Sequence, residues 1–246
     1  MKKGFRILKF KKDKPVFELK DINKSFDGRP ILKKLSIKVF PGECVGILGP
    51  NGSGKTTLFS MCIGEQSVDD GKIFINGNSI EQTPIHLRSK EGLGYLPQHR
   101  SVFNMSVYDN ILGVAQISIK DQKKQQDITE KILDEFNLQH LRSLNASVLS
   151  GGEIRRLMMG RIMIKKPKIV LLDEPLAALD PLVIQEIQKY ILKIQSSGTA
   201  ILVTDHNVKN LFDITDRSYV LGENSIIAEG TARELLKSSK AIKHYF

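Results

Sequence analysis

The strongest constraint on the fold is a glycine-rich segment, residues 49–56, that follows a short apolar run, Cys44–Leu48. The segment reads Gly-Pro-Asn-Gly-Ser-Gly-Lys-Thr and matches the pattern G-x-x-x-x-G-K-[ST]. Its glycines let the backbone curl so that successive N–H groups point at phosphate oxygens. The apolar run predicts a strand buried on both faces, and a helix is expected over residues 57–63. The chain therefore contains a strand, a phosphate-binding loop and a helix in that order, which is an α/β arrangement.

The remainder of the chain continues this α/β pattern without internal repeats. Short alternating or apolar runs predict strands at 16–20, 35–40, 44–48, 72–75, 93–96, 169–172, 200–203, 218–221 and 226–228. From residue 106 to about 163 the pattern is helical and rich in Lys, Gln, Glu and Leu. Apolar residues spaced by three or four predict an amphipathic helix over 181–195, with Asp180 as its cap and Pro181 at its first position. A helical insert at about 97–160 therefore interrupts an α/β body.

A second chemical motif ends the apolar strand at 169–172 with two carboxylates, Asp173 and Glu174. Ligands of open α/β sheets bind at the carboxyl ends of the strands, so both side chains are placed at that edge. Asp173 is suited to hold Mg²⁺ directly or through water, and Glu174 is suited to polarise an attacking water. By itself this ending is also typical of a solvated strand end. The phosphate loop favours the catalytic interpretation.

A third motif, Leu-Ser-Gly-Gly-Glu at 149–153, precedes a helical segment. Ser150 and Glu153 match the S-x-x-E capping box. A capping box does not require the two glycines Gly151 and Gly152, and each glycine costs about 0.8–1 kcal/mol in a helix interior. The cost is explained if a large group such as a phosphate must approach the bare N–H groups of this helix tip.

Charge and composition limit the remaining classes. The formal net charge is +10, and residues 1–14 hold seven basic residues and one acid. This basic arm is suited to anionic lipid or nucleic acid, or is a solvated tail. No window of about 18 apolar residues predicts a membrane span, and the first residues lack the pattern of a secretory signal. Cys44 and Cys62, both in apolar surroundings, are expected to be buried thiols of a reducing compartment.

Together these motifs resemble the ATP-binding-cassette (ABC) ATPases over about residues 16–242. The resemblance implies an α/β P-loop NTPase core with an antiparallel β subdomain and an inserted α-helical subdomain. It implies an ABC ATPase domain at 15–246 behind the arm at 1–14, with the core at about 15–96 and 161–246 and the helical subdomain at about 97–160. It also implies ATP and Mg²⁺ as cofactors and a head-to-tail homodimer that sandwiches two ATPs between the loop of one copy and the 150–153 turn of the other.

The resemblance also assigns roles to single positions. Glu174, His206 and Gln98 are the expected catalytic residues, and Thr56, Gln98 and Asp173 the expected metal ligands. Asp180 is expected to communicate across the dimer, and Phe26 to stack on adenine, where tyrosine is commoner in the family. The expected ATP-binding residues are Phe26, Gly49, Pro50, Asn51, Gly52, Ser53, Gly54, Lys55, Thr56 and Thr57. The expected contacts to the partner subunit's ATP are Ser150, Gly151, Gly152 and Glu153.

Several segments look like the branch of this family that drives lipopolysaccharide export from the inner membrane: Tyr-Leu-Pro-Gln at 95–98, Ser-Val-Tyr-Asp-Asn at 106–110, Ser-Gly-Gly-Glu at 150–153 and Thr-Asp-His-Asn-Val at 204–208. This likeness implies two integral membrane permease subunits, no nucleic acid, and a peripheral position on the cytoplasmic face of the inner membrane, with the arm as a possible aid. Phe103 and Tyr108 are candidate anchors for the permeases, or pack inside the helical insert. The alternatives are the ATPase of a branched-chain amino acid importer and a soluble ABC ATPase without membrane subunits. A P-loop kinase leaves the 150–153 turn unexplained.

Overall fold

The computed structural model describes residues 14–244. The prediction of a basic arm at 1–14 therefore falls, apart from Lys14, outside the described residues. No helix within the described range is long and apolar enough to cross a membrane.

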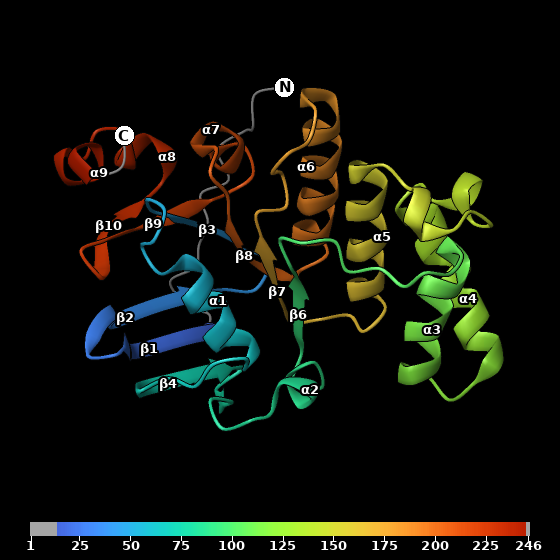
Figure 1. The fold of residues 1–246 in the computed structure, drawn as a ribbon, viewed down its shortest axis with the longest axis horizontal. Coiled ribbons are helices and arrows are strands. Elements are labelled where there is room, and N and C mark those ends of the chain that lie inside the picture. Colours follow the sequence, from blue (N-terminus) through green and yellow to red (C-terminus); the bar gives the residue numbers. More distant parts are fainter. Residues whose placement is uncertain (1–13, 245–246) are drawn as a thin grey trace.

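A six-stranded sheet forms the centre of the molecule, in the order β10-β9-β3-β8-β7-β6 (Figure 1). All neighbours pair in parallel except β10, which is antiparallel to β9. The strands β3, β7 and β8 are buried along their whole length, as expected for parallel strands covered on both faces. The bounds are β3 Cys44–Leu48, β6 Leu93–Leu96, β7 Ile169–Asp173, β8 Ala200–Thr204, β9 Arg217–Gly222 and β10 Ser225–Gly230.

A second sheet is antiparallel, with the order β2-β1-β4-β5, and lies at the opposite end of the molecule from α3 and α4 (Figure 1). Its strands are β1 Phe17–Phe26, β2 Arg29–Val39, β4 Asp70–Ile75 and β5 Asn78–Ser79. The turn Asp27-Gly28 joins β1 to β2, and both of its residues have positive φ (47° and 74°), as the tight turns of hairpins require.

The helices follow the strands along the chain. Those around the central sheet are α1 Lys55–Ile63, α2 Ile85–Arg88, α6 Pro181–Ser196, α7 Val208–Phe212, α8 Ala232–Leu235 and α9 Ser239–His244. The segment between β6 and β7 is helical and contains α3 Val107–Ser118, α4 Gln122–Glu135 and α5 Gly151–Met163, with 3-10 turns at Gln139–Leu141 and Ala146–Val148. In Figure 1 this segment projects from the edge of the sheet where β6 lies.

Two apolar clusters cover the two faces of the central sheet. One joins the helical segment and α6 to one face, with Leu172, Ile187 and Leu157 fully buried. The other joins the antiparallel sheet and α1 to the opposite face, with Phe17 and Phe59 fully buried. Neighbouring residues of β3 alternate between the clusters, because successive side chains of a strand point to opposite faces.

The observed elements confirm the predicted fold class, and each predicted strand is present. The predicted strands at 16–20 and 35–40 were too short, because β1 continues past bulges and a positive φ at Asp21 (51°) that break its alternation. The helix after the phosphate loop begins at Lys55 rather than at residue 57. The prediction that Asp180 caps α6 is wrong in its chemistry: Asp180 occupies the N-cap position, but its side chain makes no capping hydrogen bond. Both cysteines are buried thiols outside any disulfide, as predicted.

Candidate functional site

The phosphate loop lies between β3 and α1, at the carboxyl end of a buried strand. Gly52 and Gly54 have φ of 79° and 98°, which side-chain-bearing residues rarely adopt. Gly54 is the N-cap of α1 and offers no side chain to its first N–H groups. These donors are therefore left to bind an anion from outside the helix.

Lys55 is buried in this loop, with 7% of its surface exposed. Its Nζ donates to the carbonyl oxygens of Gly49 at 2.6 Å and Pro50 at 3.0 Å. Burial lowers the pKa of Lys55, and the nearby charges of Glu174 and Asp173 act in the opposite direction. The ammonium group is thus held inside the loop, close to the two carboxylates of the second motif.

Two further observations fit this loop to a phosphate group. The buried Ser53 hydroxyl finds no hydrogen-bond partner among the described residues, although buried hydroxyls normally have one. A Cβ at Gly49 would lie 2.6 Å from that hydroxyl and 3.0 Å from the carbonyl oxygen of Leu221, so only glycine is accommodated there. The loop therefore holds donors, a cation and a bare backbone, which is what a nucleotide phosphate requires.

The carboxyl ends of β7 and β8 bring together the acidic motif and Thr204. The Thr204 hydroxyl donates to Asp173 Oδ1 at 2.8 Å and accepts from the Glu174 N–H at 3.2 Å. Glu174 has a φ of 48°, a conformation that is uncommon for a residue with a side chain. Such strained positions concentrate at functional sites because the surrounding structure must hold them.

Glu174 also contacts the two other predicted catalytic residues. Gln98 Nε2 donates to Glu174 Oε2 at 2.7 Å, and His206 Nε2 lies 2.6 Å from Glu174 Oε1. The Glu174 side chain is 9% exposed, whereas that of His206 is 51% exposed. Gln98 precedes Glu174 by 76 positions and His206 follows it by 32, and the structure places both in direct contact with Glu174.

Three neighbours of the site were missed by the sequence interpretation. Arg155 of α5, 9% exposed, donates from Nη1 to the carbonyl oxygen of Pro97 at 2.9 Å and from Nη2 to that of Gln98 at 2.8 Å. The Thr204 hydroxyl bonds the Asp173 carboxylate and the Glu174 backbone N–H. Burial raises the pKa of Tyr95, and Asp173 adds to the shift through its charge and a hydrogen bond. The signal for Arg155 was an arginine on the apolar face of its helix. Tyr95 and Thr204 begin the branch-like segments at 95–98 and 204–208, but nothing in those segments assigned them a role at the site.

The Leu-Ser-Gly-Gly-Glu turn forms the predicted capping box at the start of α5. The Glu153 carboxylate accepts from the Ser150 N–H at 2.8 Å and from the Ser150 hydroxyl at 2.7 Å. Ser150 and Gly151 are exposed, but Gly152 is buried, and a Cβ there would lie 2.5 Å from a Val183 methyl group of α6. Close packing of α5 on α6 is therefore enough to require glycine at position 152 without a phosphate. The packing at Gly151 is looser, so it is a weaker reason for glycine there.

This turn lies away from the phosphate loop of its own chain. In Figure 1, β6, β7 and α6 lie between α1 and α5. A nucleotide held by the loop of one protomer is therefore not reached by the Ser150 turn of that same protomer.

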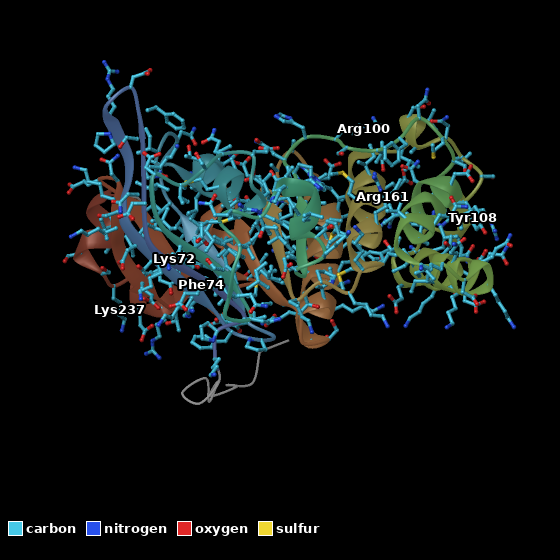
Figure 2. All side chains as sticks on the ribbon, turned by 90° about the horizontal axis from the view of Figure 1, so that it is seen from below. Lys72, Phe74, Arg100, Tyr108, Arg161 and Lys237 are labelled. Carbon is cyan, nitrogen blue, oxygen red and sulfur yellow. The ribbon has the colours of Figure 1, made fainter. Side chains whose placement is uncertain are left out.

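The remaining predicted positions lie farther from this site's centre. Phe26, 42% exposed, ends β1, and Lys24 Nζ lies 5.3 Å from the centre of its ring. Asp180 is exposed at the start of α6. Phe103, 52% exposed, has the Arg161 guanidinium 4.5 Å from its ring centre. Tyr108 is half-buried, 5.0 Å from the Arg142 guanidinium. Figure 2 shows Arg100 and Arg161 near the loop after β6, and Tyr108 farther out on the helical segment.

Fold and site together define a P-loop nucleotide-binding ATPase whose helical segment is inserted between β6 and β7. The family model described as "ABC transporter" matches residues 32–177, more than half of the chain. The chain belongs to the ABC transporter family, as one of its ATP-hydrolysing domains.

Curated relatives and solved structures agree with this assignment. The lipopolysaccharide export system ATP-binding protein LptB of Haemophilus influenzae is 39% identical over 94% of this chain and 96% of its own. The protein of the same name from Escherichia coli K12 is 39% identical over 92% and 95%. A nucleotide-free ATP-binding cassette from an ABC transporter superimposes with a TM-score of 0.84 at 26% identity, over 95% of this chain and 99% of the other. cbiO1 of Clostridium perfringens, part of the cbiONQ transporter complex, gives a TM-score of 0.85 at 25% identity, over 94% of each.

Proposed function

We propose that this chain is the ATP-hydrolysing subunit that powers lipopolysaccharide extraction from the inner membrane. The observation that carries the proposal is the 39% identity to LptB relatives, which extends over nearly the full length of both chains. The branch-like segments at 95–98, 106–110, 150–153 and 204–208 all lie within that alignable length and agree with it.

Nucleotide and metal are assigned to residues of the phosphate loop and of the strand ends. The backbone N–H groups of the loop at 49–57, to which Pro50 contributes none, and the Lys55 ammonium would bind the β- and γ-phosphates, and Phe26 would stack on the adenine. No group of three or more His, Cys, Asp or Glu side chains within residues 14–244 forms a metal site of its own. This fits Mg²⁺, which typically takes few protein ligands together with substrate phosphates. Thr56, Gln98 and Asp173 would hold that ion, which supplies charge neutralisation at the transferred phosphoryl group.

Glu174 is assigned as the general base. Its carboxylate is mostly buried and is held from both sides by Gln98 and His206. Because Gln98 contacts one carboxylate oxygen and His206 the other, one of these contacts would give way to the attacking water before Glu174 accepts its proton. His206, half exposed, would also contact the γ-phosphate, and Gln98 would report the state of the nucleotide to the helical segment.

A head-to-tail homodimer would complete the site. Ser150 and Gly151 are exposed and separated from the phosphate loop of their own chain, so they are free to meet the nucleotide of a second copy. Gly152 and Glu153 would shape this tip, and Asp180 would lie at the junction between the copies. Hydrolysis would then release the two protomers from one another.

Two integral membrane permeases would receive the resulting movement, with the chain bound on the cytoplasmic face of the inner membrane. The exposed Phe103 and the half-buried Tyr108 would line the groove that receives them. The domain division follows the same logic: a core at about 15–96 and 161–246, a helical subdomain at about 97–160, and the arm at 1–14 as an additional membrane contact.

Affinity purification of the full chain from detergent-solubilised membranes of its own host tests the cargo assignment. We expect two polytopic permeases to copurify, and the reconstituted complex to release lipopolysaccharide only with ATP. Copurification with a transporter that depends on a periplasmic amino acid-binding protein would favour the importer. Copurification with no membrane protein would favour a soluble ABC ATPase, and either result would overturn the proposal.

The substitution Glu174→Gln tests the catalytic assignment. The amide keeps the shape of the side chain but cannot accept a proton, so hydrolysis should fall by at least ~100-fold while ATP binding persists. Size-exclusion chromatography with Mg·ATP should then show a stable dimer. The exposed Glu91 offers a matched control, and Glu91→Gln should behave as the wild type. A Glu174→Gln protein with ordinary turnover would remove Glu174 from this role.

A further inference from the structure

A cavity lies at the other end of the central strands from the nucleotide site. Its volume is about 580 Å³, within the range of small-molecule sites. Lys168 and Thr199, which line it, directly precede β7 and β8, whereas Asp173 and Thr204 end those strands. The strands have five residues each, so roughly 17 Å separates the cavity from the carboxylates.

The floor of this cavity is apolar. Ile132 and Phe136 at the end of α4 face Tyr190 and Ile194 of α6, and Met163 closes the side between them. The rings of Phe136 and Tyr190 stack, with centres 5.3 Å apart and planes 19° from parallel. Covering such a surface with hydrocarbon is favourable, because it removes apolar area from water.

The rim of the cavity is cationic. Lys131, Lys166, Lys168 and Lys193 line it, against a single carboxylate, Glu135. Glu135 pairs with Lys131 of the same helix at 3.7 Å, and within residues 14–244 the other three lysines form no ion pair. An apolar floor beneath a surplus of positive charge is complementary to a molecule with an apolar body and an anionic head.

We propose that this cavity binds a single-chain lipid anion, with its hydrocarbon chain on the α4–α6 floor and its carboxylate at the lysine rim. The chain's own N-terminal arm is a poorer occupant. Lys14 is two residues from Val16, a lining residue, so the arm begins beside the cavity; but the arm carries seven basic residues and one acid and is repelled by the lysine rim. The two rings of the floor already stack on each other, and the rest of the floor consists of Ile132, Ile194 and Met163, so it suits an acyl chain better than a polar ring.

The position of the cavity means that a bound molecule would contact two parts of the protein at once. Its walls come from α4 in the helical segment and from α6 beside the central sheet. A bound chain would therefore join the helical segment to the core at a point remote from the nucleotide. The inference goes beyond the proposed transport function and does not depend on it, because binding can be measured without ATP.

Calorimetric titration of the full chain with sodium dodecanoate, below its micelle concentration, tests the proposal. We expect one site per chain, a melting temperature that rises with ligand concentration, and slower hydrogen exchange in α4 and α6. The neutral 1-dodecanol should bind at least fivefold more weakly, because it lacks the carboxylate. Dodecyltrimethylammonium should bind more weakly still.

Paired variants separate the rim from the overall charge of the protein. Lys168→Gln with Lys193→Gln should weaken dodecanoate binding by about five- to tenfold, as expected for two partly exposed ion pairs. Lys72→Gln with Lys237→Gln removes the same charge from exposed positions that do not line the cavity (Figure 2) and should leave binding unchanged.

Three results would overturn the proposal. The first is equal binding of dodecanoate and dodecanol, and the second is an equal loss in the two paired variants. The third is no binding by the full chain together with slow hydrogen exchange in residues 1–13, which would mean that the arm itself fills the cavity.

Discussion

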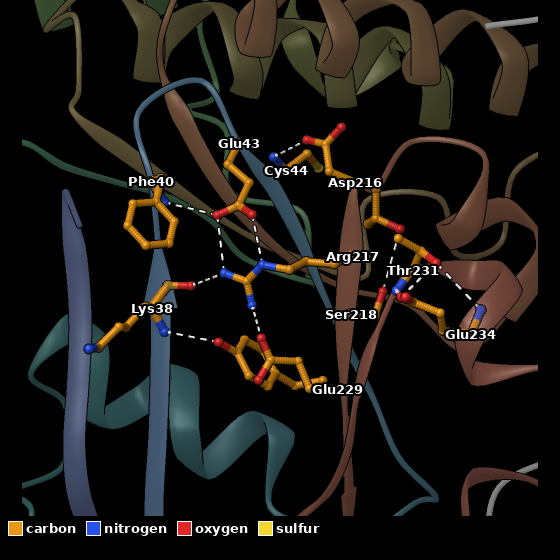
Figure 3. A network of polar contacts seen from close by, with 12 residues as sticks. Lys38, Phe40, Glu43, Cys44, Asp216, Arg217, Ser218, Glu229, Thr231 and Glu234 are labelled. Atoms are coloured by element: carbon orange, nitrogen blue, oxygen red, sulfur yellow. Dashed lines mark hydrogen bonds and ion pairs between the residues drawn. The ribbon is translucent and has the colours of Figure 1, made fainter. Parts of the chain in front are cut away.

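Replacing Glu43 with glutamine is expected to cost the fold about 2–3 kcal/mol, because both oxygens of this buried carboxylate accept hydrogen bonds (Figure 3). Glu43 is 1% exposed. Its Oε1 accepts from Arg217 Nε at 2.7 Å, and its Oε2 accepts from Arg217 Nη2 at 3.2 Å and from the Phe40 N–H at 3.0 Å. An amide would present an NH₂ group to one of these donors, so at least one donor would face another.

The size of this free-energy cost follows from the hydrogen bonds that Glu43→Gln leaves in place. Removing one partner of a buried ion pair costs about 3–5 kcal/mol. Glutamine retains one acceptor, and the Arg217 guanidinium still donates to Glu229 at 2.7 Å and to the carbonyl oxygen of Lys38 at 2.6 Å, so the cost lies below that range. Burial of Arg217 works against its charge, but the hydrogen bond and the charge of Glu43 outweigh burial and raise the pKa of Arg217. The Arg217 guanidinium therefore stays charged near neutral pH.

Urea unfolding of the full chain measures this cost. We expect a lower midpoint at an unchanged slope, and a melting temperature lower by about 5–10 °C, since 1 kcal/mol shifts the melting temperature by about 2–4 °C in a chain of this size. Glu229→Gln is the matched control: its side chain is 51% exposed, and the expected cost is about 0.2–1 kcal/mol. Equal losses in the two variants, or a loss below about 0.5 kcal/mol for Glu43→Gln, would refute the reasoning.

Three further predictions concern the helix tip and the strand ends. Gly152→Ala should lower the free energy of unfolding by about 1–3 kcal/mol, because its Cβ would meet a methyl group of α6 at 2.5 Å. Gly151→Ala should change the free energy of unfolding by no more than about 0.5 kcal/mol. A loss of ATPase activity in the stable Gly151→Ala variant would then indicate that a phosphate approaches this residue. Glu153→Gln should lower the free energy of unfolding by about 1 kcal/mol at pH 7. Since the hydrogen bond from Ser150 lowers the pKa of Glu153, the difference in this free energy between wild type and variant should shrink as pH falls below about 4.5, which chemical unfolding would measure. Thr204→Val removes a hydroxyl that bonds both neighbouring carboxylate residues, so ATP hydrolysis should fall roughly tenfold in a steady-state assay, and unchanged turnover would contradict this role.

The fold class was predictable because its signals are local. The run Cys44–Leu48 is apolar at every position and is buried at every position, so composition alone identified a central parallel strand. The helix Pro181–Ser196 kept its 3–4 spacing and ended within one residue of the expected position. The boundaries of β1 and β2 were missed because bulges shift the alternation by one residue, and because the Asp27-Gly28 turn signal was not used.

The candidate site was predictable only as a set of separate motifs, since its geometry depends on contacts between distant segments. Nothing near Gln98 in the sequence indicates that its amide meets Glu174, 76 residues away. The meeting follows from the parallel pairing of β6 with β7, which brings the ends of both strands to one edge of the sheet. Arg155 illustrates the opposite limit: its charge on an apolar helix face was visible, but its acceptors are backbone carbonyl oxygens, which every residue carries and no sequence pattern marks. Residues that take part in catalysis can thus be expected from motifs. Residues such as Arg155, which hold the backbone of the site in place, must be found in the structure.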